Sequence, residues 1–244
     1  MPPSKPNQTQ KIGDLITRTH NNPHLTTSSS QPRLSDLTPN HVHLILSDPP
    51  LKTSQCIDFF NFLLNNHSSI SFNLDLHTHF VLLRRLIKAR RFTDAKNHLN
   101  SLSTNVNLRY PFSDLASFVE NHCVEPKILA KLFNLMLKVY SDSQKFDEAL
   151  ETFNYMRNNG VKINETICTI HLIALVRCDQ VGSALEFLCQ MVESGIEVSV
   201  FSMTVVVDGL CTKRWWVEES NPILLHSAHW WMLVLRDGIL GSWI

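Results

Sequence analysis

Histidine and cysteine are the side chains of this 244-residue chain best suited to metal binding or nucleophilic attack, and there are twelve histidines and six cysteines. His41 and His43 are two residues apart, as are His77 and His79, which places the rings of each pair on different sides of a helix. No two cysteines form a C-x-x-C pair, the spacing typical of zinc sites. We therefore expect no metal centre.

Arrangements for catalysis are also missing from the sequence. Cys168 and His171 are three residues apart inside one predicted helix, but no third ligand lies nearby. No Ser-His-Asp order, pair of acids or glycine-rich phosphate loop stands out. Several cysteines fall at apolar positions of helical patterns, where a thiol behaves as a small hydrophobe. We expect no enzyme activity, no cofactor, and reduced, buried, structural thiols at Cys56, Cys123, Cys168, Cys178, Cys189 and Cys211.

The charges give a mixed indication about anionic partners. The 22 Lys and Arg residues are balanced by 22 Asp and Glu residues, so no net field favours a nucleic acid. No apolar run approaches 18 residues, and we expect no membrane partner. One basic stretch is suited to contact with backbone phosphates, although a solvated helix face is the simpler interpretation. It contains Arg84, Arg85, Lys88, Arg90, Arg91 and Lys96.

An internal repeat of 35 residues determines the predicted helices. Residues 146–153 (FDEALETF) and 181–188 (VGSALEFL) align at this offset, which also relates Gly160 to Gly195. Apolar residues recur at steps of three and four, as in amphipathic helices, and the glycines fall where a helix should end. The pattern predicts helices near residues 131–142, 146–158, 166–177, 181–193 and 201–212.

A pair of such helices cannot bury its apolar faces alone, so neighbouring repeats must stack. The first helix of each repeat is apolar on more than one side, as expected for an element between neighbours. Ala149 and Ala184 allow the second helix to approach closely. The predicted fold class is all-α, a right-handed superhelical stack of helix-turn-helix repeats (an α-solenoid).

These repeats resemble those of plant organellar pentatricopeptide repeat proteins. In residues 165–199, the segment 183–187 (SALEF) and Met191 are similar to the family's E-A-L-x-L-F-x-x-M-x-x-x-G ending. Residues 130–164 resemble a second repeat. Residues 204–211 (TVVVDGLC) are similar to the T-L-I-D-G-L-C first helix of the family.

The resemblance continues more weakly toward the N-terminus. Residues 80–95 look like a degenerate repeat that is out of register, because Ala95 and Ala149 are 54 residues apart, or 35 plus an insertion of 19. The predicted organisation is a leader at 1–35, a degenerate helical region at 36–129, repeats at 130–164 and 165–199, a partial repeat at 200–220 and a divergent tail at 221–244.

The resemblance implies that each repeat reads one base of single-stranded RNA with two polar side chains. One lies near the start of the first helix, and the other is the last residue of the repeat. These positions hold Asn134 with Asn164, Thr169 with Ser199, and Thr204 in the partial repeat. The Asn pair resembles a pyrimidine reader, and the Thr-Ser pair would favour a purine. Alternatively, Asn164 and Ser199 are helix N-caps, and the others are merely polar positions on an inner helix face.

The expected function is therefore that of a sequence-specific single-stranded RNA-binding adaptor in organellar RNA processing, stabilisation or translation. The alternative is a helical scaffold for a protein partner. Two complete repeats would read two bases, and residues 130–199 carry six Lys or Arg against nine Asp or Glu. We expect tight RNA binding to need more repeats than these.

The two ends of the chain differ from its middle. The hydroxyl-rich leader has four basic residues against the single acid Asp14, which suits a transit peptide or a disordered leader. The family resemblance favours a mitochondrial address over a chloroplast address. The repeat pattern is lost from about Asn221, and all five tryptophans lie beyond residue 214. We interpret this chain as a fragment whose gene continues the array; the alternative is that the tail is a genuine cap.

Overall fold

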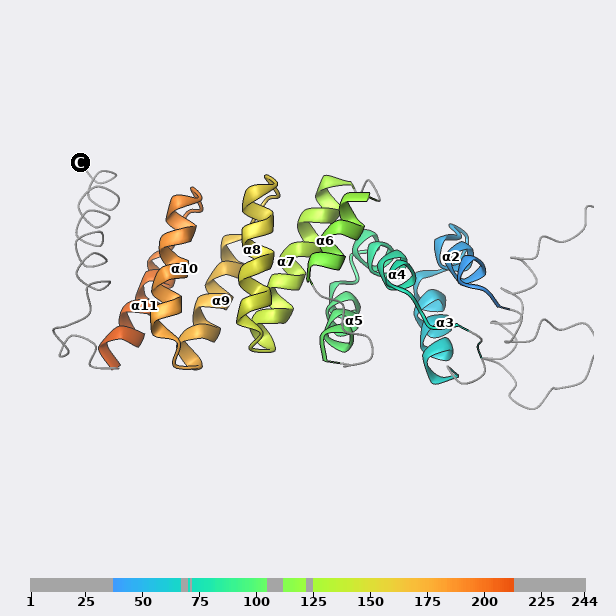
Figure 1. Ribbon diagram of the computed structural model, residues 1–244, viewed down its shortest axis with the longest axis horizontal. Helices are drawn as coiled ribbons and strands as arrows, with labels where there is room; N and C mark the ends of the chain where they lie inside the picture. Colours follow the sequence, from blue (N-terminus) through green and yellow to red (C-terminus); the bar gives the residue numbers. More distant parts are fainter. Residues whose placement is uncertain (1–36, 67–69, 71, 105–111, 122–124, 213–244) are drawn as a thin grey trace, which may run out of the picture. The chain divides into compact units, whose positions relative to one another are not determined.

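The computed structural model describes residues 37–66, 70, 72–104, 112–121 and 125–212, and the predicted leader and divergent tail lie outside these ranges. Within the described ranges the chain forms helices and no strand, and no helix there is long and apolar enough to cross a membrane. The helices are α2 (Pro39–Ser47), α3 (Thr53–Asn65), α4 (Leu76–Lys88), α5 (Phe92–Thr104), α6 (Phe112–Asn121), α7 (Pro126–Asp142), α8 (Phe146–Asn158), α9 (Glu165–Arg177), α10 (Val181–Glu193) and α11 (Val200–Thr212) (Figure 1).

The five predicted helices are all present. Helices α8 and α10 have the predicted bounds, and α9 and α11 each begin one residue earlier than predicted. Helix α7 begins five residues earlier, at Pro126, because proline suits the first helical turn, where its missing N–H leaves no hydrogen bond unmade. The all-α class and the two-helix repeat unit are confirmed.

The same turn joins the two helices of three successive hairpins. Its central residue is Arg90, Gln144 or Asp179, with φ of 58°, 59° and 64°. The following residue donates its N–H to the carbonyl oxygen five positions earlier at 2.9 Å in each case, which is the Schellman motif. Arg90 and Gln144 are 54 residues apart, so the α4–α5 hairpin is the out-of-register repeat expected from the sequence.

The predicted glycine caps are also present. Gly160 follows α8 with φ of 63°, and Gly195 follows α10 with φ of 68°. Val161 N–H bonds to the Met156 carbonyl oxygen at 2.9 Å, and the corresponding bond after Gly195 is 3.0 Å long. Glycine enters this left-handed conformation without steric cost, so each second helix ends cleanly.

Helix α6 accounts for the 19-residue insertion. It lies in the chain between α5 and α7, where the later repeats have only a short linker. Helix α6 packs against α8, and its Phe118 ring lies 5.1 Å from the Phe80 ring and 5.4 Å from the His77 ring, centroid to centroid. An additional packed helix therefore causes the register shift.

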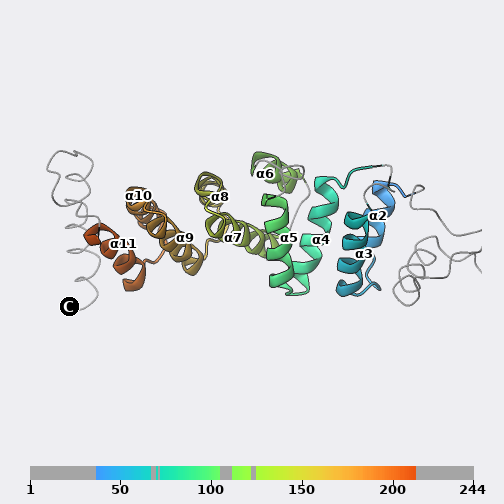
Figure 2. The same cartoon turned by 90° about the horizontal axis from the view of Figure 1, so that it is seen from below.

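The described residues divide into two compact units, and the division falls inside α9 after His171. In the first unit α7 packs against α4, α5 and α8, and α7 and α8 lie side by side, as do α4 and α5 (Figures 1 and 2). Ala149 of α8 is completely buried, as its predicted role requires. Helix α7 is buried on more than one face, through Ile128, Leu132, Phe133, Met136, Leu137, Val139 and Tyr140.

In the second unit α11 packs against α10, and Ala184 of α10 is completely buried. Gly209 of α11 also permits a close approach, because a Cβ atom there would lie 2.9 Å from Val176 Cγ1. Val206 and Leu210 of α11 are buried, whereas the neighbouring Val207 is 44% exposed. Only one side of this apolar helix is therefore covered.

The predicted burial of the cysteines holds only in part. Cys56 and Cys168 are buried, and burial raises the pKa of the Cys168 thiol to about 12, which keeps it protonated. Cys178 and Cys189 are half-buried. The prediction is wrong for Cys211, which is exposed because it lies one residue, about 100° of helical rotation, beyond the buried Leu210. Cys123 lies outside the described residues.

Three histidines with lowered pKa values make the stability of the fold sensitive to acid. His79 Nδ1 lies 3.1 Å from His98 Nε2, and His171 Nδ1 lies 2.8 Å from Ser141 Oγ. Burial lowers the pKa of His79 and of His171 to about 4, and burial together with the neighbouring His79 lowers the pKa of His98 to about 3. The unfolded chain, with histidine pKa near 6.5, therefore binds more protons than the folded chain between these values.

We predict that stability changes little between pH 7 and 8 and falls by about 1–2 kcal/mol per histidine of lowered pKa as the pH drops from 6.5 to 5. Urea unfolding followed by circular dichroism at pH 5, 6, 7 and 8 measures this change. His171→Gln, whose side chain does not titrate, should remove about a third of the dependence. Equal stability at pH 5 and pH 7 would contradict the prediction.

Candidate nucleic-acid interface

The structure brings together the first predicted pair, Asn134 on α7 and Asn164 before α9. Asn134 Nδ2 donates to the carbonyl oxygens of Ala130 at 2.6 Å and Lys162 at 2.9 Å. Asn134 Oδ1 accepts the backbone N–H of Asn164 at 2.8 Å. Because carbonyl oxygens only accept and backbone N–H groups only donate, these partners fix which end of the carboxamide is nitrogen.

Asn164 is the N-cap of α9, as the structural alternative expected. Its Oδ1 accepts the backbone N–H of Thr166 at 2.9 Å, and its carbonyl oxygen accepts the N–H of Cys168 at 3.2 Å. The residue is exposed. No hydrogen bond within the described residues engages its Nδ2 group, which therefore presents two donors to solvent.

The remaining predicted readers are tied to their own helices. Thr169 is buried, and its Oγ1 donates to the Glu165 carbonyl oxygen at 3.1 Å. Ser199 caps α11, with its Oγ accepting the Ser202 N–H at 3.2 Å. Thr204 is exposed and donates to the Val200 carbonyl oxygen at 2.8 Å. Thr169 belongs to the first unit, whereas Ser199 and Thr204 belong to the second.

The three first-helix positions share one hydrogen bond. Asn134, Thr169 and Thr204 each donate to the carbonyl oxygen four residues earlier. For a threonine this bond uses the only hydroxyl hydrogen. Thr169 Oγ1 also lies 3.2 Å from Glu165 Oε1. In the first pair, the amide hydrogens that face solvent belong to Asn164.

Five of the six side chains of the basic stretch contact other groups of the protein. Arg85 donates to the carbonyl oxygens of Leu46 and Asp48 at 2.8 Å each, and also to that of Leu51. The other pairs are Lys88 with Glu125 at 2.6 Å, Arg84 with Glu125 at 3.7 Å, Arg91 with Asp94 at 2.6 Å and Lys96 with Asp142 at 2.7 Å. These contacts support a solvated helix face, rather than a phosphate-binding surface, as the interpretation of this stretch.

Contacts among histidines escaped the sequence analysis. The rings of His43 and His77 lie 4.1 Å apart, and His43 Nε2 contacts Asp75 Oδ1 at 3.2 Å and Thr78 Oγ1 at 2.9 Å. His43 and Thr78 are 35 residues apart, so the repeat period was a usable signal. Among the described residues, no group of three His, Cys, Asp or Glu side chains could hold a metal ion.

The contact between Ser141 and His171 was also missed. It resembles part of a catalytic pair, but both side chains are at most 2% exposed, so a substrate cannot reach them. Ser141 Oγ also donates to the Leu137 carbonyl oxygen at 2.6 Å, and the Phe146 ring packs edge-on against the imidazole. The pair instead satisfies two buried polar groups where α9 meets α7.

Helical hairpins with one turn geometry and polar side chains at recurring first-helix positions define a helical-repeat protein. A family model described as "Pentatricopeptide repeat-containing protein" matches residues 93–215, and the chain belongs to the pentatricopeptide repeat family. The chain spans between 18% and 41% of the length of the curated relatives that it matches.

Two relatives from Arabidopsis thaliana illustrate the similarity. Pentatricopeptide repeat-containing protein At2g32630 is 34% identical over 156 residues, which cover 63% of this chain and 25% of that protein. The mitochondrial protein At2g13420 is 26% identical over 216 residues, covering 82% and 41%. Another matched relative is named as mitochondrial and one as chloroplastic. The crystal structure of the pentatricopeptide repeat protein PPR10 from maize aligns with 18% identity and a TM-score of 0.40, covering 89% of this chain and 26% of that one.

We predict that Asn164→Ala lowers the free energy of unfolding by about 1 kcal/mol, because it removes the side chain that caps α9. Asn164→Asp serves as the matched control, since its carboxylate still accepts the Thr166 N–H and suits a helix N-terminus. Chemical denaturation of the three proteins provides the comparison. Equal midpoints for Asn164→Ala and the wild type would show that the cap contributes nothing.

Proposed function

We propose that this protein binds single-stranded RNA through the polar pairs of its repeats, as an adaptor in organellar RNA processing, stabilisation or translation. The observation that carries the proposal is the contact between Asn134 and Asn164, the two residues that the family resemblance assigns to one base. Membership of the pentatricopeptide repeat family supports it.

The chemistry of this pair suits a base edge. Asn164 Nδ2 offers hydrogen-bond donors to solvent, and Asn134 Oδ1 has a second lone pair. A base edge that places an acceptor beside a donor complements this arrangement, and the resemblance favours a pyrimidine. The resemblance assigns Thr169, Ser199 and Thr204 to further bases, each through its hydroxyl group. The amide and hydroxyl groups of these side chains would recognise a base by hydrogen bonding.

The binding is expected to depend little on phosphate contacts. Five of the six basic residues between Arg84 and Lys96 form ion pairs or hydrogen bonds with other groups of the protein, and residues 130–199 are net acidic. Phosphate contacts normally supply much of the affinity for nucleic acids. We infer that tight, specific binding uses additional repeats, such as those of the longer relatives.

A protein-binding scaffold is the competing function. Such a scaffold would carry an apolar strip or a charge clamp at the positions of the polar pairs. The first pair is instead two asparagines, with an amide nitrogen turned to solvent. This observation favours RNA as the partner.

We predict that Asn164→Asp reduces RNA affinity about tenfold or more while leaving stability unchanged. It preserves the cap but replaces the two amide donors with a second acceptor, and a good bidentate base contact discriminates by about 1–3 kcal/mol. Fluorescence anisotropy with randomised single-stranded RNA at fixed low salt measures the change.

Asn158→Asp is the matched control, because it adds the same charge at an exposed position on the last turn of α8. It should bind RNA as the wild type does. Equal affinity for Asn164→Asp and the wild type would remove the base-reading assignment. Equal losses in both variants would reduce the effect to charge repulsion.

We also propose an organellar location, with the mitochondrion ahead of the chloroplast. The acid-poor leader supports this, as do the mitochondrial and chloroplastic names of matched relatives. We predict that residues 1–60 fused to a fluorescent protein accumulate in mitochondria of plant cells, because such a leader directs import. Plastid fluorescence would support the other organelle, and cytosolic fluorescence would refute the proposal.

A further inference from the structure

We propose that residues 222–235 of this chain, here called the tail segment, return to α11 and cover a stripe of exposed side chains on it. The stripe consists of Val200, Thr204, Val207 and Cys211 and is called the α11 stripe. This contact does not depend on the RNA-binding function. It gives the alternative expected from the sequence, that the divergent tail is a cap, a defined place to bind.

The α11 stripe runs along one side of the helix. Residues four, seven and eleven positions after Val200 share its face of an α-helix. All four side chains are exposed, Val200 to 77%, and none is charged. The neighbouring Phe201 is exposed too, so three of the six large apolar side chains that are exposed in the described residues belong to this one helix. Such an apolar patch marks a surface that binds another segment.

The same positions are covered in the earlier repeats. The 35-residue period relates Val207 to Leu172 of α9 and to Leu137 of α7, and both leucines are completely buried. It also relates the exposed Thr204 to Thr169, which is buried. The exposure of the α11 stripe therefore comes from the place of α11 as the last described helix, and not from the position within the repeat.

The first helix of the following repeat contributes to this cover. Cys211 corresponds to Val176 of α9 and to Ser141 of α7. A Cβ atom at Gly209 of α11 would lie 2.9 Å from Val176 Cγ1, so this end of α9 packs against α11. Ser141 Oγ in turn lies 2.8 Å from His171 Nδ1 on α9. A first helix is thus covered by a segment that follows it in the chain, and the same relation assigns the α11 stripe to a segment beyond Thr212.

The composition and length of the tail segment suit the α11 stripe. Its 14 residues (PILLHSAHWWMLVL) include nine large apolar side chains and no Asp, Glu, Lys or Arg. As a helix it would be about 20 Å long, the same as α11. Nine residues, 213–221, separate it from the end of α11 and can span about 30 Å, so it can reach either end of that helix. Two uncharged surfaces bury each other without removing a charge from water.

The covalent link favours the tail segment over a second copy of the chain. A segment on a short linker is present at an effective concentration of about 1 mM, whatever the concentration of the protein. A second copy would cover the α11 stripe only as far as its own concentration allows. The two occupants therefore respond differently to dilution.

The first test uses the intrinsic fluorescence of the complete chain, which reports on the tail alone because all five tryptophans lie beyond residue 214. We expect Val207→Glu, which places a charge in the α11 stripe, to shift tryptophan emission to longer wavelength and to increase its quenching by acrylamide about twofold. Glutamate favours helix more than valine does, so α11 itself should persist.

Gln180→Glu is the matched control, because it adds the same charge at an exposed position directly before α10. It should change neither the emission nor the quenching. Equal emission and quenching for Val207→Glu and the wild type would overturn the proposal, as would equal changes in Val207→Glu and Gln180→Glu.

The second test changes the tail segment and leaves α11 intact. Leu224→Glu, Leu225→Glu and Leu233→Glu are combined in one full-length variant, which places a charge on three sides of the segment if it is helical. We expect maleimide to label Cys211 about tenfold faster in this variant than in the wild type, as read for each cysteine by mass spectrometry. The half-buried Cys189 of α10 should be labelled at the same rate in both proteins.

Equal labelling of Cys211 in the two proteins would overturn the proposal. Faster labelling of Cys189 to the same degree would also overturn it, because the tail would then support the whole unit and not the α11 stripe. Dilution identifies the occupant: the tryptophan emission of the wild type should stay the same from about 10 μM to about 0.1 μM. A shift to longer wavelength on dilution would mean that another chain covers the α11 stripe and would overturn the proposal.

Discussion

The left-handed residue at each hairpin turn is the constraint on which the rest of the structure depends. Two amphipathic helices bury their faces only if the second returns at a fixed angle, and one residue with positive φ produces that return. Arg90, Gln144 and Asp179 occupy this conformation although none is a glycine. Packing of the fully buried Ala95, Ala149 and Ala184 then holds each pair of helices closed against the strain of the turn.

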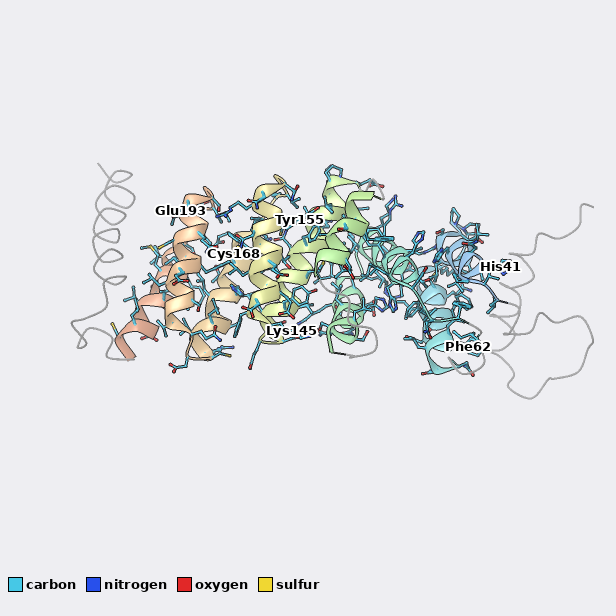
Figure 3. All side chains as sticks on the ribbon, viewed as in Figure 1. His41, Phe62, Lys145, Tyr155, Cys168 and Glu193 are labelled. Carbon is cyan, nitrogen blue, oxygen red and sulfur yellow. The ribbon has the colours of Figure 1, made fainter. Side chains whose placement is uncertain are left out.

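Connections between hairpins within the first unit depend on long polar side chains that bind backbone carbonyl groups. The Lys145 ammonium group, labelled in Figure 3, donates to the Ser103 carbonyl oxygen at the end of α5. Arg85 and Asn134 bind carbonyl groups in the same way. These contacts satisfy helix ends and linkers that would otherwise lack partners. Two of the three side chains, Arg85 and Lys145, are cations whose N–H groups are directed into the protein by these bonds.

The sequence predicted what the 35-residue period controls and missed what depends on distant partners. Helices α8 and α10 and their glycine caps follow from the periodicity. The resemblance singled out Asn134 and Asn164 as a pair, but the hydrogen bond between them was not predicted. Helix α6 occurs once, so no repeat identified it. Asn134 Nδ2 donates to the carbonyl oxygen of Lys162, which is 28 residues away in the sequence. A backbone carbonyl group has no signature in the sequence, so this bond could not be predicted. The polarity of a residue alone could not show whether its side chain is exposed to solvent or hydrogen-bonded within the protein.

The out-of-register hairpin carries an apolar residue at the position that corresponds to Asn134. Subtracting the 54-residue offset from Asn134 gives Phe80, at the same place relative to the turn of its hairpin. Phe80 is buried, and its ring packs edge-on against Phe118 of the inserted helix α6. An apolar residue there offers no hydrogen bond to a base edge, and α6 covers it. Phe80 and α6 thus pack on each other, and α4 and α5 of this hairpin both contact α7 of the next hairpin.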